Sequence, residues 1–355
     1  MHTGGYDIGV VPGDGIGPEL VGSAQEVLTA AAGDGVEVRF HVEDAGADTY
    51  RRTGTACSDE TFDRLRSYDG ILKGPVGLPG VRRPDGTEGG LLGGLLRGGL
   101  DTYVNERPIS LLPGVDGPLR GERRIDHVIV RENTEGLYLA RGLGVGNERA
   151  VVDQLLMTRE GVERVVRYAF ELARRRPGAP ADGVHRVTCV DKANVLRSFA
   201  FFRRIFDEIA EEYPDVQTDH RYADAAGHDL VVDPEHFDVL VMENFLGDIL
   251  SDVAAATVGG LGMCPGGNIG DAHAYFEPIH GSAPAIAGRD LANPVSQILA
   301  AAMLADHLGE RPVGDRIRAA VRTGFARGDI VILPSGSPKD GTDAVTRAVI
   351  GALES

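Results

Sequence analysis

The chain has 355 residues, of which 53 are acidic and 36 basic, so its formal net charge is −17. This excess of negative charge argues against a nucleic-acid-binding protein, because such proteins usually present a basic surface to the phosphates. Apolar residues make up 42% of the sequence, enough for a sizeable core in one large domain or two. The three cysteines lack metal-site spacing, and neither a signal peptide nor a membrane-spanning run is evident, which predicts a cytoplasmic protein.

Strands and helices alternate along the chain, which predicts an α/β fold with a largely parallel central sheet. Strands are expected at 6–11, 36–41, 71–73, 127–130, 187–190 and 239–242. Helices are expected at 20–32, 161–176, 200–212, 247–256, 298–308 and 315–326. The segment 78–99 is rich in Gly and Pro and is predicted to be a loop that leads into a helix.

The first predicted strand is followed by the glycine-rich stretch PGDGIGPE, from Pro12 to Glu19. A dinucleotide-binding G-x-G-x-x-G pattern would need a third glycine where Pro18 stands. Proline instead suits the first turn of a helix. The stretch therefore indicates a tight turn before a helix and argues against a Rossmann phosphate loop.

The stretch NFLGDILSD places Asp248 and Asp252 four residues apart, so both carboxylates share one face of the predicted helix. Two like charges at this spacing destabilise a helix unless something neutralises them. A divalent cation does so, and oxygen ligands suit Mg²⁺ or Mn²⁺. The alternative is a pair of solvated aspartates. Asp224, after another apparent strand, is a third candidate carboxylate.

Cationic residues also follow predicted strands, where active sites of open α/β sheets lie. Lys192 can act as a base if its surroundings lower its pKa. Arg131 at a strand end suits bidentate recognition of a carboxylate, and Arg97 and Arg107 lie in apolar or turn settings. Tyr138 is a candidate proton donor. Together with the aspartates, these residues describe a site for a metal-chelating polycarboxylate.

The motifs that carry these residues occur in a recognisable order: GVVPGDGIGPE, YVNERP, VRENTEGLY, DKANVL, NFLGDILSD, EPIHGSAPAIAG and LANP. In this order the chain resembles the β-decarboxylating dehydrogenases, which act on isopropylmalate, isocitrate, homoisocitrate, tartrate or D-malate. The resemblance implies two domains built on one long mixed sheet, not a Rossmann fold. Residues 1–102 and 258–355 would form a discontinuous cofactor-side domain. Residues 103–257 would form a smaller domain with the dimer interface and the metal and substrate residues.

The resemblance also implies a role for each candidate residue of the catalytic site. Three arginines would grip the substrate carboxylates: Arg97, Arg107 and Arg131. Three aspartates would hold Mg²⁺ or Mn²⁺: Asp224, Asp248 and Asp252. Lys192 would be the base that removes the hydroxyl proton, and Tyr138 would help to protonate C3. In the homodimer expected from the family, Lys192 and the catalytic Asp224 would come from the neighbouring chain.

For the cofactor, the resemblance implies that Asn194 contacts the nicotinamide end. The residues along the adenosine half would be His280, Gly281, Ala283 and Asn293. NAD-dependent members carry Asp at position 285, whereas NADP-dependent members carry Lys and Tyr at 285 and 286. This chain has Ala285 and Ile286 there, and the latter favours NAD, with NADP as the alternative.

Substrate choice depends on the stretch 89–97, GGLLGGLLR. Gly93 and Gly94 occupy the positions where isopropylmalate enzymes carry a leucine pair and homoisocitrate enzymes an extra arginine. A shifted register would bring Leu91–Leu92 or Leu95–Leu96 into the pocket instead. The predicted function is oxidative decarboxylation of a 3-substituted (R)-malate, isopropylmalate-like. The alternatives are a homoisocitrate, isocitrate, tartrate or D-malate dehydrogenase, an enzyme for a specialised phosphonate-bearing malate, and a non-catalytic regulatory paralogue.

Overall fold

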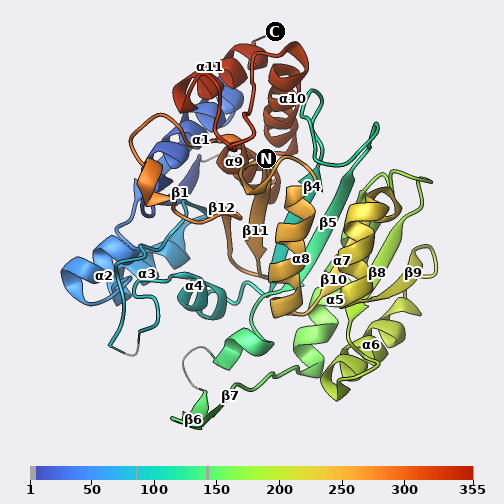
Figure 1. Ribbon diagram of the computed structural model, residues 1–355. Helices are drawn as coiled ribbons and strands as arrows, with labels where there is room; N and C mark the ends of the chain where they lie inside the picture. Colours follow the sequence, from blue (N-terminus) through green and yellow to red (C-terminus); the bar gives the residue numbers. More distant parts are fainter. Residues whose placement is uncertain (1–4, 85, 141–143, 355) are drawn as a thin grey trace.

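A ten-stranded mixed sheet runs through the computed structural model, which describes residues 5–84, 86–140 and 144–354 (Figure 1). The strand order is β2-β1-β3-β12-β11-β4-β5-β10-β8-β9. This arrangement confirms the predicted α/β fold with one long mixed sheet. Within the described ranges, none of the helices has the length and apolar character needed to cross a bilayer.

The strands of the large sheet are β1 (Tyr6–Val11), β2 (Val38–Val42), β3 (Gly70–Lys73), β4 (Val104–Ser110), β5 (Asp126–Glu132), β8 (Arg186–Asp191), β9 (Gln217–Tyr222), β10 (Val239–Met242), β11 (Pro265–Ile269) and β12 (Ala274–Pro278). A separate antiparallel pair consists of β6 (Val145–Asn147) and β7 (Ala150–Val152). The α-helices are α1 (Gly17–Ala32), α2 (Ala47–Thr53), α3 (Asp59–Ser67), α4 (Gly93–Gly99), α5 (Arg159–Arg175), α6 (Arg197–Ala210), α7 (Ala223–Val232), α8 (Asn244–Ala256), α9 (Val295–His307), α10 (Arg311–Arg327) and α11 (Thr342–Leu353).

The expectation of a largely parallel sheet holds at both ends of the sheet and is wrong at its centre. Strands β12, β11, β4 and β5 pair antiparallel to one another. The strands on either side pair parallel, as βαβ connections require. Only a short turn, 270–273, joins β11 to β12, and a turn of this kind can join only antiparallel strands.

Two buried apolar clusters support the sheet. One gathers side chains from β1, α1, α9 and α10, among them Ile8 and Ile317. The other lies between α5, α6 and the strands β5, β8 and β10, and it contains Phe170 and Phe206 with ring centroids 5.4 Å apart. The second cluster lies within the segment expected to form the smaller domain. The boundaries proposed at residues 102 and 257 stay a prediction.

Candidate active site

A cavity of about 840 Å³ lies against the central strands of the sheet, between α4, α8 and the loop after β12. It collects the three arginines expected from the sequence, together with Tyr138 and Asp248. Its lining residues from strands include Lys73, Asn105, Arg107, Arg131 and Glu277, and those from α4 are Gly93, Gly94, Leu95 and Arg97. Segments far apart in the sequence therefore bring the predicted substrate-binding residues into one chamber.

Arg131 is a buried cation at the end of β5, with 1% of its side chain exposed. Its Nε and Nη2 donate hydrogen bonds to Asn244 Oδ1 at 2.9 and 2.7 Å. Its Nη1 pairs with the carboxylate of Asp248. Burial, with the nearby charges of Arg97 and Arg107, lowers the pKa of Arg131 to about 9.

Arg107 enters the same chamber from β4, where side chains two residues apart share a face. Its Nε donates to Asn105 Oδ1 and its Nη1 to Ser251 Oγ, both at 2.6 Å. Its Nη2 lies 3.7 Å from Asp248 Oδ1. These contacts fix the guanidinium beside Asp248, with Nη2 turned towards that carboxylate.

Arg97 differs from the other two arginines, because its buried Nε has no hydrogen-bond partner among the described residues. A buried donor without a partner costs free energy, and this cost falls when an acceptor arrives. Arg97 therefore marks a place in the cavity that suits an anionic oxygen.

Sequence reasoning missed a buried ion pair in the cavity wall. Lys73, with 2% of its side chain exposed, pairs with the carboxylate of Glu277. Asn268 Nδ2 donates to Glu277 Oε1 at 2.9 Å, and Asn105 Nδ2 donates to Asn268 Oδ1 at 3.0 Å. A signal was available, because Lys73 ends a predicted strand and Glu277 opens the EPIHG motif. Through Asn105, this polar network reaches Arg107.

Asp248 and Asp252 lie four residues apart on α8, as expected. Tyr138 donates its hydroxyl hydrogen to Asp248 Oδ2 at 2.8 Å. Burial raises the pKa of Asp248, but the charges of Arg131 and Arg107 outweigh this effect and lower it below its ordinary value. Partial burial raises the pKa of Asp252, and Asp248 adds to this effect.

The third predicted metal ligand does not join these two aspartates within the chain. Asp224 lies in the first turn of α7 and accepts a hydrogen bond from Lys192 Nζ at 2.7 Å. This bond lowers the pKa of Asp224. Their side chains are 73% and 31% exposed, and neither lines the cavity. Across the described ranges, no group of three His, Cys, Asp or Glu is placed to hold a metal ion.

A groove of about 270 Å³ continues the cavity, because His280 and Gly281 line both. Five of the residues expected to bind the cofactor line this groove: His280, Gly281, Ala283, Ile286 and Asn293. Ala285 is exposed in the same turn but does not line the groove. Asn194 is exposed beyond β8, and neither the groove nor the cavity includes it.

The glycine turn after β1 contributes Ile16 to the lining of this groove. Ile16 donates its backbone N–H to Ser282 O at 2.8 Å. Gly15 has φ +58°, and a Cβ there would lie 2.0 Å from the same oxygen. Only glycine allows this approach. The carboxylate of Asp14 accepts backbone N–H bonds from Ala47, Asp48 and Gly77 at 2.8–2.9 Å.

The wall formed by α4 and the residues before it shows which leucines of the stretch 89–97 face the cavity, a question that the sequence left open. Leu91 and Leu95 line the cavity and are 40% and 41% exposed. Leu92 and Leu96 are fully buried in the core. One leucine from each pair therefore faces the cavity, whereas the two predicted alternatives placed a whole pair there. Adjacent side chains on a helix point in different directions, which explains the difference for Leu95 and Leu96 on α4, whereas Leu91 and Leu92 precede this helix.

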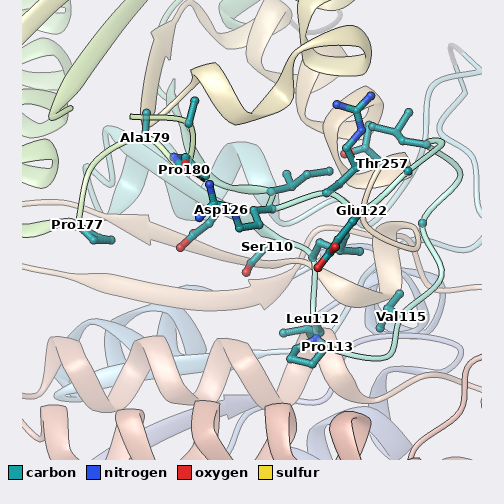
Figure 2. Close-up of a pocket in the computed structure, with 18 of the residues that line it drawn as sticks. Ser110, Leu112, Pro113, Val115, Glu122, Asp126, Pro177, Ala179, Pro180 and Thr257 are labelled. Carbon is teal, nitrogen blue, oxygen red and sulfur yellow. Dashed lines mark hydrogen bonds between the residues drawn. The ribbon is translucent and has the colours of Figure 1, made fainter. Parts of the chain in front are cut away.

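A larger cavity, of about 1010 Å³, lies between the loop after β4 and the segment 177–183 (Figure 2). Its charged side chains include Arg123, which pairs with Glu235, and Arg124, which donates to Pro180 O. The residues predicted for catalysis, metal binding or cofactor binding are absent from its lining in the part of the chain that the structure describes.

Comparison with known proteins shows the family to which the chain belongs. Residues 7–332 match the family described as isocitrate/isopropylmalate dehydrogenase. The chain belongs to this dehydrogenase family. It is therefore an enzyme of the oxidoreductase class, as the ordered motifs suggested.

Family members of known name or structure cover almost the whole chain. A 3-isopropylmalate dehydrogenase from Leifsonia xyli subsp. xyli is 45% identical over 89% of this chain and 90% of its own length. One from Corynebacterium glutamicum is 42% identical over 98% of this chain and 99% of its own. The crystal structure of isocitrate dehydrogenase from Methylococcus capsulatus matches with a TM-score of 0.87 at 38% identity, covering 99% of this chain and 100% of that one. The apo form of a β-decarboxylating dehydrogenase from Thermococcus kodakarensis matches with a TM-score of 0.81 at 40% identity, covering 98% of this chain and 96% of that one.

Proposed function

We propose that this dehydrogenase oxidises and decarboxylates a 3-substituted (R)-malate with an apolar substituent, isopropylmalate-like, with NAD and Mg²⁺ or Mn²⁺. One observation carries the proposal. A single cavity holds Arg97, Arg107 and Arg131, and its lining also includes the uncovered side chains of Leu91 and Leu95. A malate with an apolar 3-substituent needs both cationic and apolar contacts. Relatives named 3-isopropylmalate dehydrogenase support this substrate class.

The three arginines would bind the two carboxylates of the malate. Guanidinium groups recognise carboxylates in bidentate fashion, and here they lie in a buried setting where such bonds are strong. Arg97 brings a donor without a partner, and Arg131 brings a guanidinium whose pKa burial has lowered. Both features favour a bound anion over an empty cavity.

For the metal, the donors have suitable chemistry but are incomplete within one chain. Asp248 and Asp252 supply carboxylate oxygens on one helix face, which suits Mg²⁺ or Mn²⁺. A third carboxylate would come from Asp224 of a second copy. When bound, the metal would supply Lewis-acid polarisation of the 2-oxo group.

Lys192 would act as the base that removes the proton from the 2-hydroxyl group. Its Nζ is held by Asp224, and its side chain is partly exposed at the surface of this chain. The residues of the groove beside His280 would hold the dinucleotide, whose chemistry would be to supply the acceptor for the C2 hydride. After CO₂ leaves from C3, Tyr138 would help to return a proton to that carbon. Its hydroxyl lies on Asp248, beside the arginines.

A homodimer with shared sites would bring Lys192 and Asp224 to the cavity of the other copy. Exposed apolar side chains occur on the neighbouring elements: Val195 follows Lys192, Val232 ends α7 and Ile249 lies on α8, and they are 69%, 54% and 47% exposed. The β6–β7 pair adds exposed valines. An apolar surface of this kind typically marks an interface.

The reduced state of three buried cysteines is consistent with the cytoplasmic location that we propose.

The groove beside His280 and Asn293 would take the adenosine half of the cofactor. Position 285 carries an uncharged alanine, and Ser335, Gly336 and Ser337 are among the residues that line the groove. We propose NAD because the groove lining includes no lysine or arginine for the additional phosphate of NADP among the described residues.

A tricarboxylate such as homoisocitrate or isocitrate is the second candidate substrate. Lys73 and Arg83 also line the cavity, beyond the three predicted arginines. Either cation would suit a third carboxylate on the C3 substituent. Lys73, however, is already paired with Glu277.

Steady-state turnover with Mn²⁺ tests the proposal. The enzyme is assayed with isopropylmalate, homoisocitrate, isocitrate, D-malate, tartrate and 3-phosphonomethylmalate, each with NAD and with NADP. We expect isopropylmalate with NAD to give the highest kcat/KM, by at least tenfold. A higher kcat/KM for a tricarboxylate would replace the first candidate with the second. Failure of all six substrates would contradict the proposed class.

A further inference from the structure

A second cleft lies on the opposite face of the sheet from the active-site cavity. Side chains alternate across β4, so Glu106 faces away from Asn105 and Arg107. Glu106 lines two adjoining cavities of about 520 and 270 Å³ between α5, α9 and α10. Both cavities also share Leu172, Arg176 and Asp306, so they form one continuous cleft, here called the rear cleft.

Arginines without a carboxylate partner border the rear cleft from two sides. Arg175 at the end of α5 and Arg311 at the start of α10 line the larger cavity. No ion pair joins either guanidinium to a described carboxylate, although Arg175 Nε donates to Glu171 O at 3.2 Å. Arg322 lines the smaller cavity and lies 3.5 Å from Ser110 Oγ. All three arginines are exposed, so their side chains concentrate positive charge at this cleft in a protein with net charge −17.

The carboxylates of the rear cleft do not balance these arginines. Asp306 is held by Arg318 at 2.8 and 2.9 Å. Asp126 is paired with Arg176 at 3.2 Å. Glu106 accepts a hydrogen bond from Tyr168, and burial raises its pKa, although the charges of Arg175 and Arg176 act in the opposite direction.

Apolar side chains also line the rear cleft, beside its charged residues. Ile269, Phe276, Leu172 and Met303 line the larger cavity. The ring of His307 lies beside that of Phe276, with centroids 5.7 Å apart. Apolar side chains beside an arginine lower the local dielectric constant, which strengthens its hydrogen bonds to an anion.

We propose that the rear cleft binds a small polyvalent oxyanion, a metabolite with phosphate or carboxylate groups, held between Arg175 and Arg311. Guanidinium groups bind both kinds of oxyanion through parallel N–H bonds. The two arginines come from helices far apart in the sequence and border the same cavity, so one ligand would bridge them. The site is separate from the active-site cavity, and the proposal does not depend on the enzyme's substrate.

Equilibrium dialysis of the purified enzyme with pyrophosphate, and separately with citrate, tests this proposal. The active-site arginines also bind anions, so the decisive comparison is between variants. The double variant Arg175→Gln/Arg311→Gln removes two cations from the rear cleft. The control Arg66→Gln/Arg347→Gln removes two exposed cations from α3 and α11, outside the rear cleft.

We expect the rear-cleft variant to lose at least tenfold in affinity for one pyrophosphate or citrate per chain, and the control to keep it. A loss for pyrophosphate alone would identify a phosphate ligand, and a loss for citrate alone a carboxylate ligand. Equal binding of both probes by the wild type, the rear-cleft variant and the control would overturn the proposal. Unchanged turnover and circular dichroism would show that both double variants are folded.

Discussion

At the scale of single residues, the active-site cavity is held in a state that favours an anion. Arg131 is fully buried, and Arg97 and Arg107 repel its charge, which together lower its pKa to about 9. Asp248 offsets part of this repulsion by pairing with Arg131. Buried like charges cost free energy, so a dicarboxylate that neutralises them stabilises the site as it binds.

A buried histidine outside the site has an effect on acid stability. His127 on β5 is 0% exposed, and neither ring nitrogen has a hydrogen-bond partner among the described residues. Burial, with the nearby charge of Arg176, lowers its pKa to about 3, against about 6.5 in the unfolded chain. The unfolded state therefore binds a proton first as the pH falls. His127 contributes stability above pH 6.5 that is lost between about pH 6.5 and 3, at about 1.4 kcal/mol per pH unit.

The variant His127→Leu should lose this part of the pH dependence. Urea unfolding at pH 7 and pH 5 measures the free energy of unfolding of both proteins. We expect the wild type to lose about 2 kcal/mol more than the variant over this interval. An equal loss in the two proteins would show that His127 is protonated in the folded state or has an unseen partner.

At the scale of helices and strands, the sequence predicted elements with a clear period or position. The helix that carries Asp248 and Asp252 follows from its apolar spacing, and the strand before Lys192 from its run of apolar residues. Strand β11 has the sequence PGGNI, which shows neither a period nor strand formers, so it was missed. The sequence also left open which leucines near α4 face the cavity, because two leucine pairs separated by two glycines fit several arrangements.

The position of Leu95 in the cavity wall leads to a prediction about substrate choice. Leu95→Arg puts a cation where an apolar substituent would lie, so kcat/KM for isopropylmalate should fall tenfold to a hundredfold. The kcat/KM for homoisocitrate should rise relative to the kcat/KM for isopropylmalate. Val42→Arg, at an exposed apolar residue of β2 that lines neither the cavity nor the groove, is the control and should leave both values unchanged. An unaltered ratio in Leu95→Arg would mean that the substituent lies elsewhere in the cavity.

At the scale of the whole molecule, the sequence motifs named the site residues, but geometry decides which of them meet. The cavity gathers Arg97, Arg107 and Arg131 because the mixed sheet and α4 converge there. Lys192 and Asp224 lie apart from it, which residue type and spacing do not reveal and only the family resemblance implied. The rear cleft was also beyond sequence reasoning, because the helices that form it are distant in the chain.

A shared site predicts that two inactive variants restore each other. Lys192→Ala should lose turnover and retain most of its Mn²⁺ binding, and Asp248→Asn should also lose turnover. When the two are expressed together with different tags, half of the dimers should be mixed, and each mixed dimer would contain one intact site. Turnover of the total pool should therefore reach about a quarter of the wild-type value.

The purified mixed dimer gives the sharper measurement, because about half of the wild-type turnover is expected from it. A mixture of separately purified proteins that do not exchange subunits is the control and should stay inactive. If each site were formed by one chain, every site in the mixed dimer would carry one damaging substitution. Its turnover would then stay at the level of the single variants, and the assignment of Lys192 and Asp224 to the neighbouring cavity would be wrong.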